Sequence, residues 1–174
     1  MSGTPFSFDQ PETIDRLRDS ARTIESFLKL VPERWTHRAP DGWPDDAWSV
    51  AMNLAHMVAY EEQLATPVME SIAAGGTGQD VVPSGGEGWL LESAQAMAGA
   101  SLDSLAARLR ATRERQIAII DAMSGDLFNT PKTMLWSGRS GGEAHAVSWV
   151  AAKTFQHTWE HGNAILRIAL FAPR

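Results

Sequence analysis

The sequence contains no cysteine among its 174 residues. This absence excludes disulfide bonds, thiolate zinc sites and a cysteine nucleophile, so any thiol chemistry requires an external thiol. It fits a reducing compartment, and we expect a cytoplasmic protein. Residues 1–6 have neither the basic nor the apolar segment of a secretory signal. No uncharged apolar run reaches the roughly 18 residues that a membrane helix needs, so we expect no membrane partner.

An excess of basic residues is also missing. Lysine and arginine together number 15 against 21 acidic residues, which gives a formal net charge of -6. Without a basic stripe the chain cannot release counterions from a phosphate backbone, so we expect no nucleic-acid partner. The composition is otherwise that of a globular protein, with 44% hydrophobic and 21% charged residues. A chain of this length fits one domain, and we treat residues 1–174 as that domain.

Four long amphipathic segments dominate the chain. Their apolar residues recur every three or four positions, which is the pattern of helices with one buried face. These segments are residues 11–31, 49–74, 101–123 and 143–170. The sequence therefore predicts an all-α fold, a four-helix bundle with long loops after the second and third helices. The long loops leave the relative directions of the helices open.

Individual residues indicate where these helices begin, bend and end. Pro11 suits a first helical turn, and Ser49 and Ser101 are candidates to cap the second and third helices. Pro67 lies inside the second pattern and predicts a kink there. The connections are predicted to contain a short helix at residues 89–98 and an extended piece at residues 133–136.

Two histidines, His157 and His161, lie four residues apart in the last predicted helix. Residues at this spacing share one helix face, with Cβ atoms about 5–6 Å apart. Both lie on the apolar stripe, where desolvation is unfavourable unless each imidazole finds a partner. A shared metal ion satisfies both. The third candidate ligand is His56, which lies to one side of the second helix's main stripe. That helix is apolar around most of its circumference, so His56 can also face inward.

Other metal motifs of helical proteins are absent. The carboxylate di-iron pattern Glu-x-x-His does not occur, because the residues three positions before the candidate ligands are Asn53, Thr154 and Thr158. His-Glu-x-x-His is missing too, which excludes the common metalloprotease helix. We interpret His37 and His145 as ordinary polar residues. The glycine-rich residues 75–88 lack the Lys-Ser/Thr ending of a phosphate loop.

Further polar residues interrupt or adjoin the apolar stripes. Metal-bound imidazoles need hydrogen-bond partners that fix their tautomers, and Glu61, Glu62 and Glu160 are nearby candidates. Glu61 is the most suggestive because it lies inside an apolar stripe. Gln116 lies within the inward stripe of the third helix. It is either a tolerated boundary residue or an amide that lines the site.

A family resemblance rests on two short motifs. The run Trp48-Ser49-(x)4-Leu54-Ala55-His56, followed by His157-(x)3-His161 on the last helix, resembles the DinB/YfiT-like superfamily. The resemblance covers nearly the whole chain in length and helix order. It implies a four-helix bundle in which His56, His157 and His161 bind a divalent metal ion. Relatives include transferases and isomerases that use low-molecular-weight thiols such as mycothiol or bacillithiol.

The chemistry of such a site is coherent without the resemblance. Three neutral imidazoles leave a divalent ion with at least one open position, as in catalytic zinc sites. The ion lowers the pKa of a water or thiol and so supplies a nucleophile near neutral pH. We expect a metal-dependent transferase or hydrolase that acts on a small-molecule substrate with water or an external thiol. Zinc, nickel, iron and copper all suit the ligands. A non-catalytic metal- or ligand-binding bundle is the alternative, and a structural homodimer is a third interpretation.

Overall fold

The structure, a computed structural model, describes residues 8–43, 48–81, 88–133 and 144–172. Its α-helices are α1 (Gln10–Leu28), α2 (Val50–Tyr60), α3 (Thr66–Ala73), α4 (Gly88–Met97), α5 (Leu102–Asp121), α6 (Gly125–Asn129) and α7 (Val147–Phe171). Shorter helical turns are η1 (Glu33–Trp35), η2 (Glu61–Ala65) and η3 (Gln79–Val81). Two short strands, β1 (Lys132–Thr133) and β2 (Ala144–His145), pair antiparallel. None of the helices in these ranges combines the length and apolarity needed to cross a bilayer.

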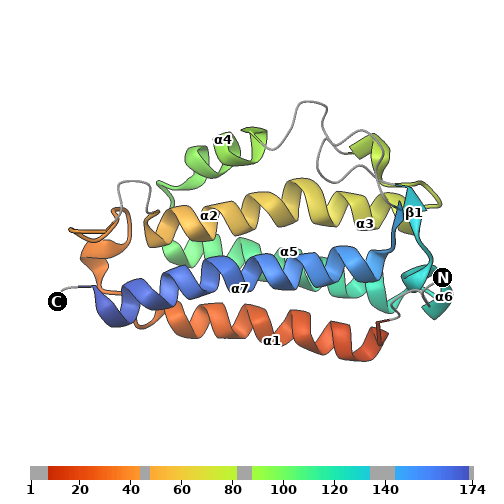
Figure 1. The fold of residues 1–174 in the computed structure, drawn as a ribbon, viewed down its shortest axis with the longest axis horizontal. Helices are drawn as coiled ribbons and strands as arrows, with labels where there is room; N and C mark the ends of the chain where they lie inside the picture. The colour runs from red at the N-terminus through yellow and green to blue at the C-terminus, as the bar shows by residue number, and fades with distance from the viewer. Residues whose placement is uncertain (1–7, 44–47, 82–87, 134–143, 173–174) are drawn as a thin grey trace, which may run out of the picture.

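The long helices form a four-helix bundle, which confirms the all-α prediction. α1 packs against α5 and α7, and α2 packs against the same two helices, so α1 and α2 lie on one diagonal of the bundle. Figure 1 shows that α1 and α7 run in one direction, whereas α2–α3 and α5 run in the other. Because α3 and α5 run the same way, the chain must cross back between them. This crossover contains α4, which lies along α2.

Caps and strands fix where the helices begin. The Ser49 hydroxyl accepts from the Met52 amide at 3.1 Å, and Ser101 caps α5 in the same way. Both predicted caps are therefore confirmed, and the predicted short helix matches α4. The last helix was predicted from Glu143 but begins at Val147, because Ala144–His145 is strand β2. Glu143 itself lies outside the described residues, as does the predicted extended piece beyond Thr133.

The second predicted helix changes its pitch rather than simply kinking. η2 is a π-helical turn between α2 and α3, and Pro67 follows it in the first turn of α3. Proline lacks an N–H and its ring clashes with the carbonyl four residues earlier, so a regular α-helix cannot pass through this position undisturbed. A π turn widens the helix locally and relieves that conflict. Glu61, at the start of η2, is fully buried.

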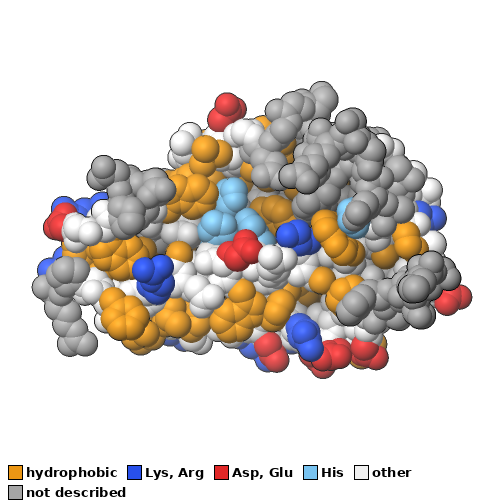
Figure 2. Space-filling model, in the orientation of Figure 1, with side chains coloured by type: hydrophobic (Ala, Val, Ile, Leu, Met, Phe, Trp, Pro, Cys, Tyr) orange, Lys and Arg blue, Asp and Glu red, His pale blue; other side chains and the backbone are white. Residues whose placement is uncertain are grey.

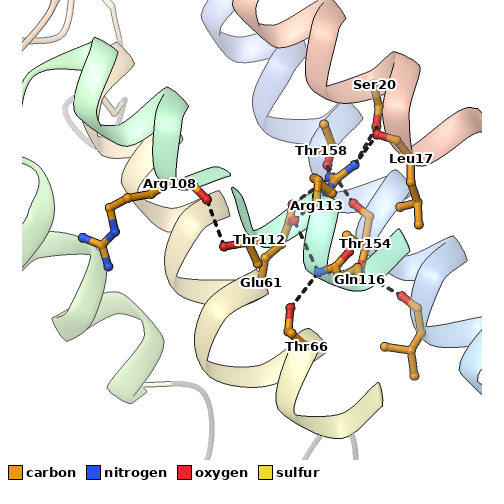
Figure 3. A network of polar contacts seen from close by, with 11 residues as sticks. Leu17, Ser20, Glu61, Thr66, Arg108, Thr112, Arg113, Gln116, Thr154 and Thr158 are labelled. Atoms are coloured by element: carbon orange, nitrogen blue, oxygen red, sulfur yellow. Dashed lines mark hydrogen bonds and ion pairs between the residues drawn. The ribbon is translucent and has the colours of Figure 1, made fainter. Parts of the chain in front are cut away.

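A buried ion pair lies at the centre of the bundle (Figure 3). The Arg113 guanidinium of α5 donates to both oxygens of Glu61, from Nε at 2.5 Å and from Nη2 at 2.6 Å. Its Nη1 donates to the Leu17 carbonyl at 3.0 Å and to the Ser20 hydroxyl at 2.7 Å. Nη2 also donates to the Thr158 hydroxyl. One side chain therefore joins α5 to η2, α1 and α7.

Gln116 extends this network rather than lining a site. Its amide donates to the Thr66 hydroxyl at 3.0 Å and reaches Glu61 Oε2 at 3.4 Å. The side chain is fully buried, so the prediction of a tolerated boundary residue is wrong. Burial raises the pKa of the Glu61 carboxyl, against the opposing effects of Arg113 and Gln116. Arg113 is thus the main group that stabilises the ionised Glu61 carboxylate in the buried polar centre.

Removing the arginine should therefore destabilise the bundle. We expect Arg113→Met to lower the free energy of unfolding by about 3–5 kcal/mol, because it leaves the Glu61 charge buried without its partner. Arg110→Met on the same helix breaks only the exposed pair with Glu25 and should cost about 0–1 kcal/mol. Urea unfolding followed by circular dichroism measures both. Equal losses in the two variants would contradict the assigned role of the buried pair.

Candidate functional site

α2 is the helix that positions His56. Its residues are buried on nearly every side, with Val50, Ala51, Asn53, Leu54, Ala55, Met57, Val58, Ala59 and Tyr60 all in the core. This burial follows from its place in the bundle, because α2 contacts α4, α5 and α7 at once. A helix with three neighbours has no solvent face to which His56 must turn. The side chain is partly buried and lies on the side that meets α7.

α7 supplies the other two histidines. Thr154 and Thr158 of this helix are buried, and each hydroxyl donates to the carbonyl four residues earlier. Thr158 also meets Arg113, which fixes the rotation of α7 about its axis. With the threonines directed to the bundle centre, His157 and His161 lie on the adjacent stripe, beside α2. Both histidines are partly buried.

The three imidazoles converge on one point. The ring centroid of His56 lies 5.0 Å from that of His157 and 4.8 Å from that of His161. The centroids of the two α7 rings are 4.5 Å apart. Each ring offers a nitrogen, and these three nitrogens lie within 4.8 Å of one another. Figure 2 shows histidine side chains gathered on one face over α2 and α7, bordered by hydrophobic, acidic and basic side chains.

Aromatic rings surround the histidines. The Trp48 indole is nearly parallel to the His161 ring, with centroids 5.5 Å apart and an angle of 9°. It meets the His56 ring edge-on at 5.0 Å. The Tyr60 ring lies 4.2 Å from the His157 ring on the other side of the cluster. These contacts restrict the rotation of all three imidazoles and so hold their nitrogens together.

Asn53 fixes the tautomer of one histidine. Its amide nitrogen donates to the backbone carbonyls of Ser49 at 2.9 Å and Trp48 at 3.3 Å. This orientation leaves the amide oxygen as an acceptor, 2.9 Å from Nδ1 of His161. His161 must therefore carry its proton on Nδ1, and Nε2 keeps a lone pair. Helical periodicity contains no signal for this contact between residues 53 and 161.

Burial keeps the α7 histidines neutral. Desolvation, together with the smaller effects of the charges of His161, His56, Arg113 and Lys153, lowers the pKa of His157 to about 2. Desolvation, followed by the charge of His56, lowers the pKa of His161 to about 4. Neutral imidazole is the form that binds metal, so neither side chain must lose a proton before binding at neutral pH.

A small pocket opens beside the cluster. Its volume is about 150 Å³, and its walls are His56, Tyr60, Leu64, Leu90, Lys153, His157 and Glu160. The first three residues form a stripe along α2 and η2, and the last three form a facing stripe along α7. Leu90 of the crossover helix α4 closes a third side. Ser93 of the same helix donates to Gln63 of η2 at 2.9 Å and holds α4 in place.

Several other predicted residues lie away from the cluster. Glu61 pairs with Arg113, and Glu62 pairs with Arg108 at 2.5 Å, so neither is seen to bind an imidazole. His37 contacts the Ala98 carbonyl at 3.1 Å, and the His145 ring stacks on Trp149 at 3.8 Å. Both roles are structural, as expected for ordinary polar residues. Glu160 is exposed at the mouth of the pocket.

The cluster fits a divalent metal ion. Three neutral nitrogen donors within 4.8 Å are a suitable set for zinc and its first-row neighbours. Nδ1 of His157 is buried and has no hydrogen-bond partner in the described part of the chain, although an isolated buried nitrogen is unfavourable. Protein atoms alone therefore leave this site incomplete. Three imidazoles also leave room for a further ligand on the pocket side.

Comparisons with known proteins agree on the fold. No curated protein matches the chain. A solved structure of an uncharacterized protein from Clostridium difficile 630 is similar, with 18% identity, a TM-score of 0.71, and coverage of 92% of this chain and 95% of that one. A Streptococcus pneumoniae protein is also similar, with 19% identity, a TM-score of 0.67, and coverage of 92% and 90%.

Both similarities cover nearly the whole chain. At sequence identities of 18% and 19% they show that the fold is shared, and nothing about function. A family model described as the DinB superfamily matches residues 16–165, a range that includes α2, α5, most of α7 and all three clustered histidines. This chain therefore belongs to the DinB superfamily.

Proposed function

We propose that the protein is a metal-dependent enzyme in which His56, His157 and His161 bind one divalent ion. The observation that carries this proposal is the convergence of three imidazole nitrogens within 4.8 Å at the edge of a pocket. When bound, such an ion lowers the pKa of a water or thiol in its open position and supplies a nucleophile at neutral pH. The chain has no cysteine, so a thiol would be an external low-molecular-weight cosubstrate.

The residues around the cluster perform the other tasks of such an enzyme. Asn53 and Trp48 orient the His161 ring, through a hydrogen bond and parallel stacking respectively. Leu64 and Leu90 present apolar walls that exclude water from one side of the pocket. The pocket volume of about 150 Å³ restricts the reacting part of the substrate to a few heavy atoms. We therefore infer a small-molecule substrate and a transfer or hydrolysis reaction.

Metal content tests the ligand set directly. We expect the purified protein to hold about one divalent ion per chain, and His157→Ala to lose it, because two imidazoles alone bind weakly. His37→Ala is the matched control, since His37 lies outside the histidine cluster and its ring nitrogen contacts the Ala98 backbone carbonyl. Elemental analysis after reconstitution measures both variants. Equal metal content in the wild type and His157→Ala would overturn the proposed site.

Turnover separates an enzyme from a binding protein. We expect metal-loaded protein to accelerate the reaction of a bacterial thiol with monochlorobimane, or hydrolysis of a small ester or amide substrate. His157→Ala should reduce the rate to background, because it removes the metal. Fluorescence and absorbance assays follow these reactions. If the metal is bound but no substrate is turned over, the alternative of a non-catalytic metal- or ligand-binding bundle is correct.

Asn53 should tune the affinity for metal. Replacing the hydrogen-bond partner of a ligating imidazole typically weakens metal binding about 10–100-fold, and we expect this for Asn53→Leu. Asn53→Asp keeps an acceptor for Nδ1 of His161 and should bind metal at least as tightly as the wild type. Competition with a chromophoric chelator measures the affinities. If both variants lose affinity equally, Asn53 acts only through its donors to the backbone carbonyls of residues 48 and 49.

A further inference from the structure

Lys153 is the cation that lines the pocket. It lies one helical turn before His157, and residues at this spacing share a helix face. Its side chain is partly buried, and Nζ donates to the Gln156 amide oxygen at 3.2 Å. Within the described ranges no carboxylate forms an ion pair with it, in contrast to Arg108, Arg110 and Arg113. Its charge is therefore available to a ligand in the pocket.

Glu160, the acidic residue of the pocket, does not cancel this charge. It lies seven residues from Lys153, which corresponds to about 10 Å along the helix axis. Its carboxylate accepts from the Gln156 amide at 2.9 Å. Glu160 is exposed, so water and salt screen its field more strongly than that of the partly buried lysine. Gln156 forms a hydrogen bond with each of the two side chains, so Lys153 and Glu160 are bridged through a neutral amide and not through a direct ion pair.

The remaining walls of the pocket contain no carboxylate. They are His56, His157, Tyr60, Leu64 and Leu90. The Glu61–Arg113 pair beneath them has no net charge. A divalent ion on the histidines would add two further positive charges. With such an ion bound, the positive charges at the pocket would outweigh the exposed Glu160 and would favour ligands that carry a negative charge.

We propose that Lys153 makes this pocket selective for small ligands that carry an anionic group, such as a carboxylate, close to the atom that approaches the histidines. This inference rests on the proposed metal site and specifies its substrate class. The lysine ammonium would bind the anionic end while Leu64 and Leu90 contact the short apolar part. Lys153 is thus a specificity-determining residue.

Three thiols of similar size but different charge test this selectivity. Mercaptoacetate is anionic, 2-mercaptoethanol is neutral and cysteamine is cationic. Their binding to cobalt-loaded protein is measured from the thiolate-to-cobalt absorption band. We expect mercaptoacetate to bind about tenfold more tightly than 2-mercaptoethanol, and cysteamine to bind most weakly. Lys153→Met should remove this preference, and Lys153→Glu should reverse it.

Lys29→Met is the matched control, because Lys29 is exposed and lies outside the pocket walls. It removes the same charge from the protein and should retain the preference for mercaptoacetate. Circular dichroism and cobalt stoichiometry check that each variant keeps the fold and the site. Equal affinities for the three thiols, or an unchanged preference in Lys153→Met, would overturn the charge selection alone. Failure to bind cobalt, or no thiolate band with any thiol, would overturn the metal site and the selectivity together.

Discussion

The buried contact between Arg113 and Glu61 is the interaction on which the rest of the structure depends. An arginine cannot lose its proton in a protein, so its burial requires that its N–H groups all find acceptors. Here the acceptors come from three elements: Glu61 of η2, the Leu17 carbonyl and Ser20 hydroxyl of α1, and the Thr158 hydroxyl of α7. A rotation or shift of any of these elements would leave a charged donor unsatisfied. The polar centre therefore specifies the register of the bundle more strictly than apolar packing does.

This register determines where the histidines lie. Thr158 lies between His157 and His161 in the sequence, and its bond to Arg113 directs one stripe of α7 to the bundle centre. The histidines must then occupy the neighbouring stripe, where they meet α2. The π turn η2 has a similar effect on the other side, because Glu61 follows Tyr60 directly yet points to Arg113 while Tyr60 lies beside His157. The core pair thus contacts α7 through Thr158 and directly follows α2 through Glu61, and these two helices supply the histidines.

Sequence periodicity predicts the bundle and the inward position of His157 and His161, because these depend on local patterns of three and four residues. His56 lies to one side of the main stripe of its helix, so periodicity alone does not turn it inward. Periodicity also could not predict the partner of Glu61. Arg113 lies beside the apolar stripe of α5, and a hydrophobic pattern assigns a charged residue to the surface. Glu61 and Arg113 are 52 residues apart, so only the packed bundle brings them together. The contact of Asn53 with His161 spans 108 residues and was missed for the same reason.

The cations on the two sides of α7 have different kinds of partner. Toward the bundle centre, the buried guanidinium is matched by a carboxylate and by hydroxyl and carbonyl oxygens. Toward the pocket, Lys153 donates to the neutral amide of Gln156, and no carboxylate in the described part of the chain forms an ion pair with it. An unpaired cation contributes little to stability, because it gains no Coulomb energy from a partner. It does retain its full attraction for an incoming anion. The arrangement therefore separates the charge that holds the fold from the charge that is free to select a ligand.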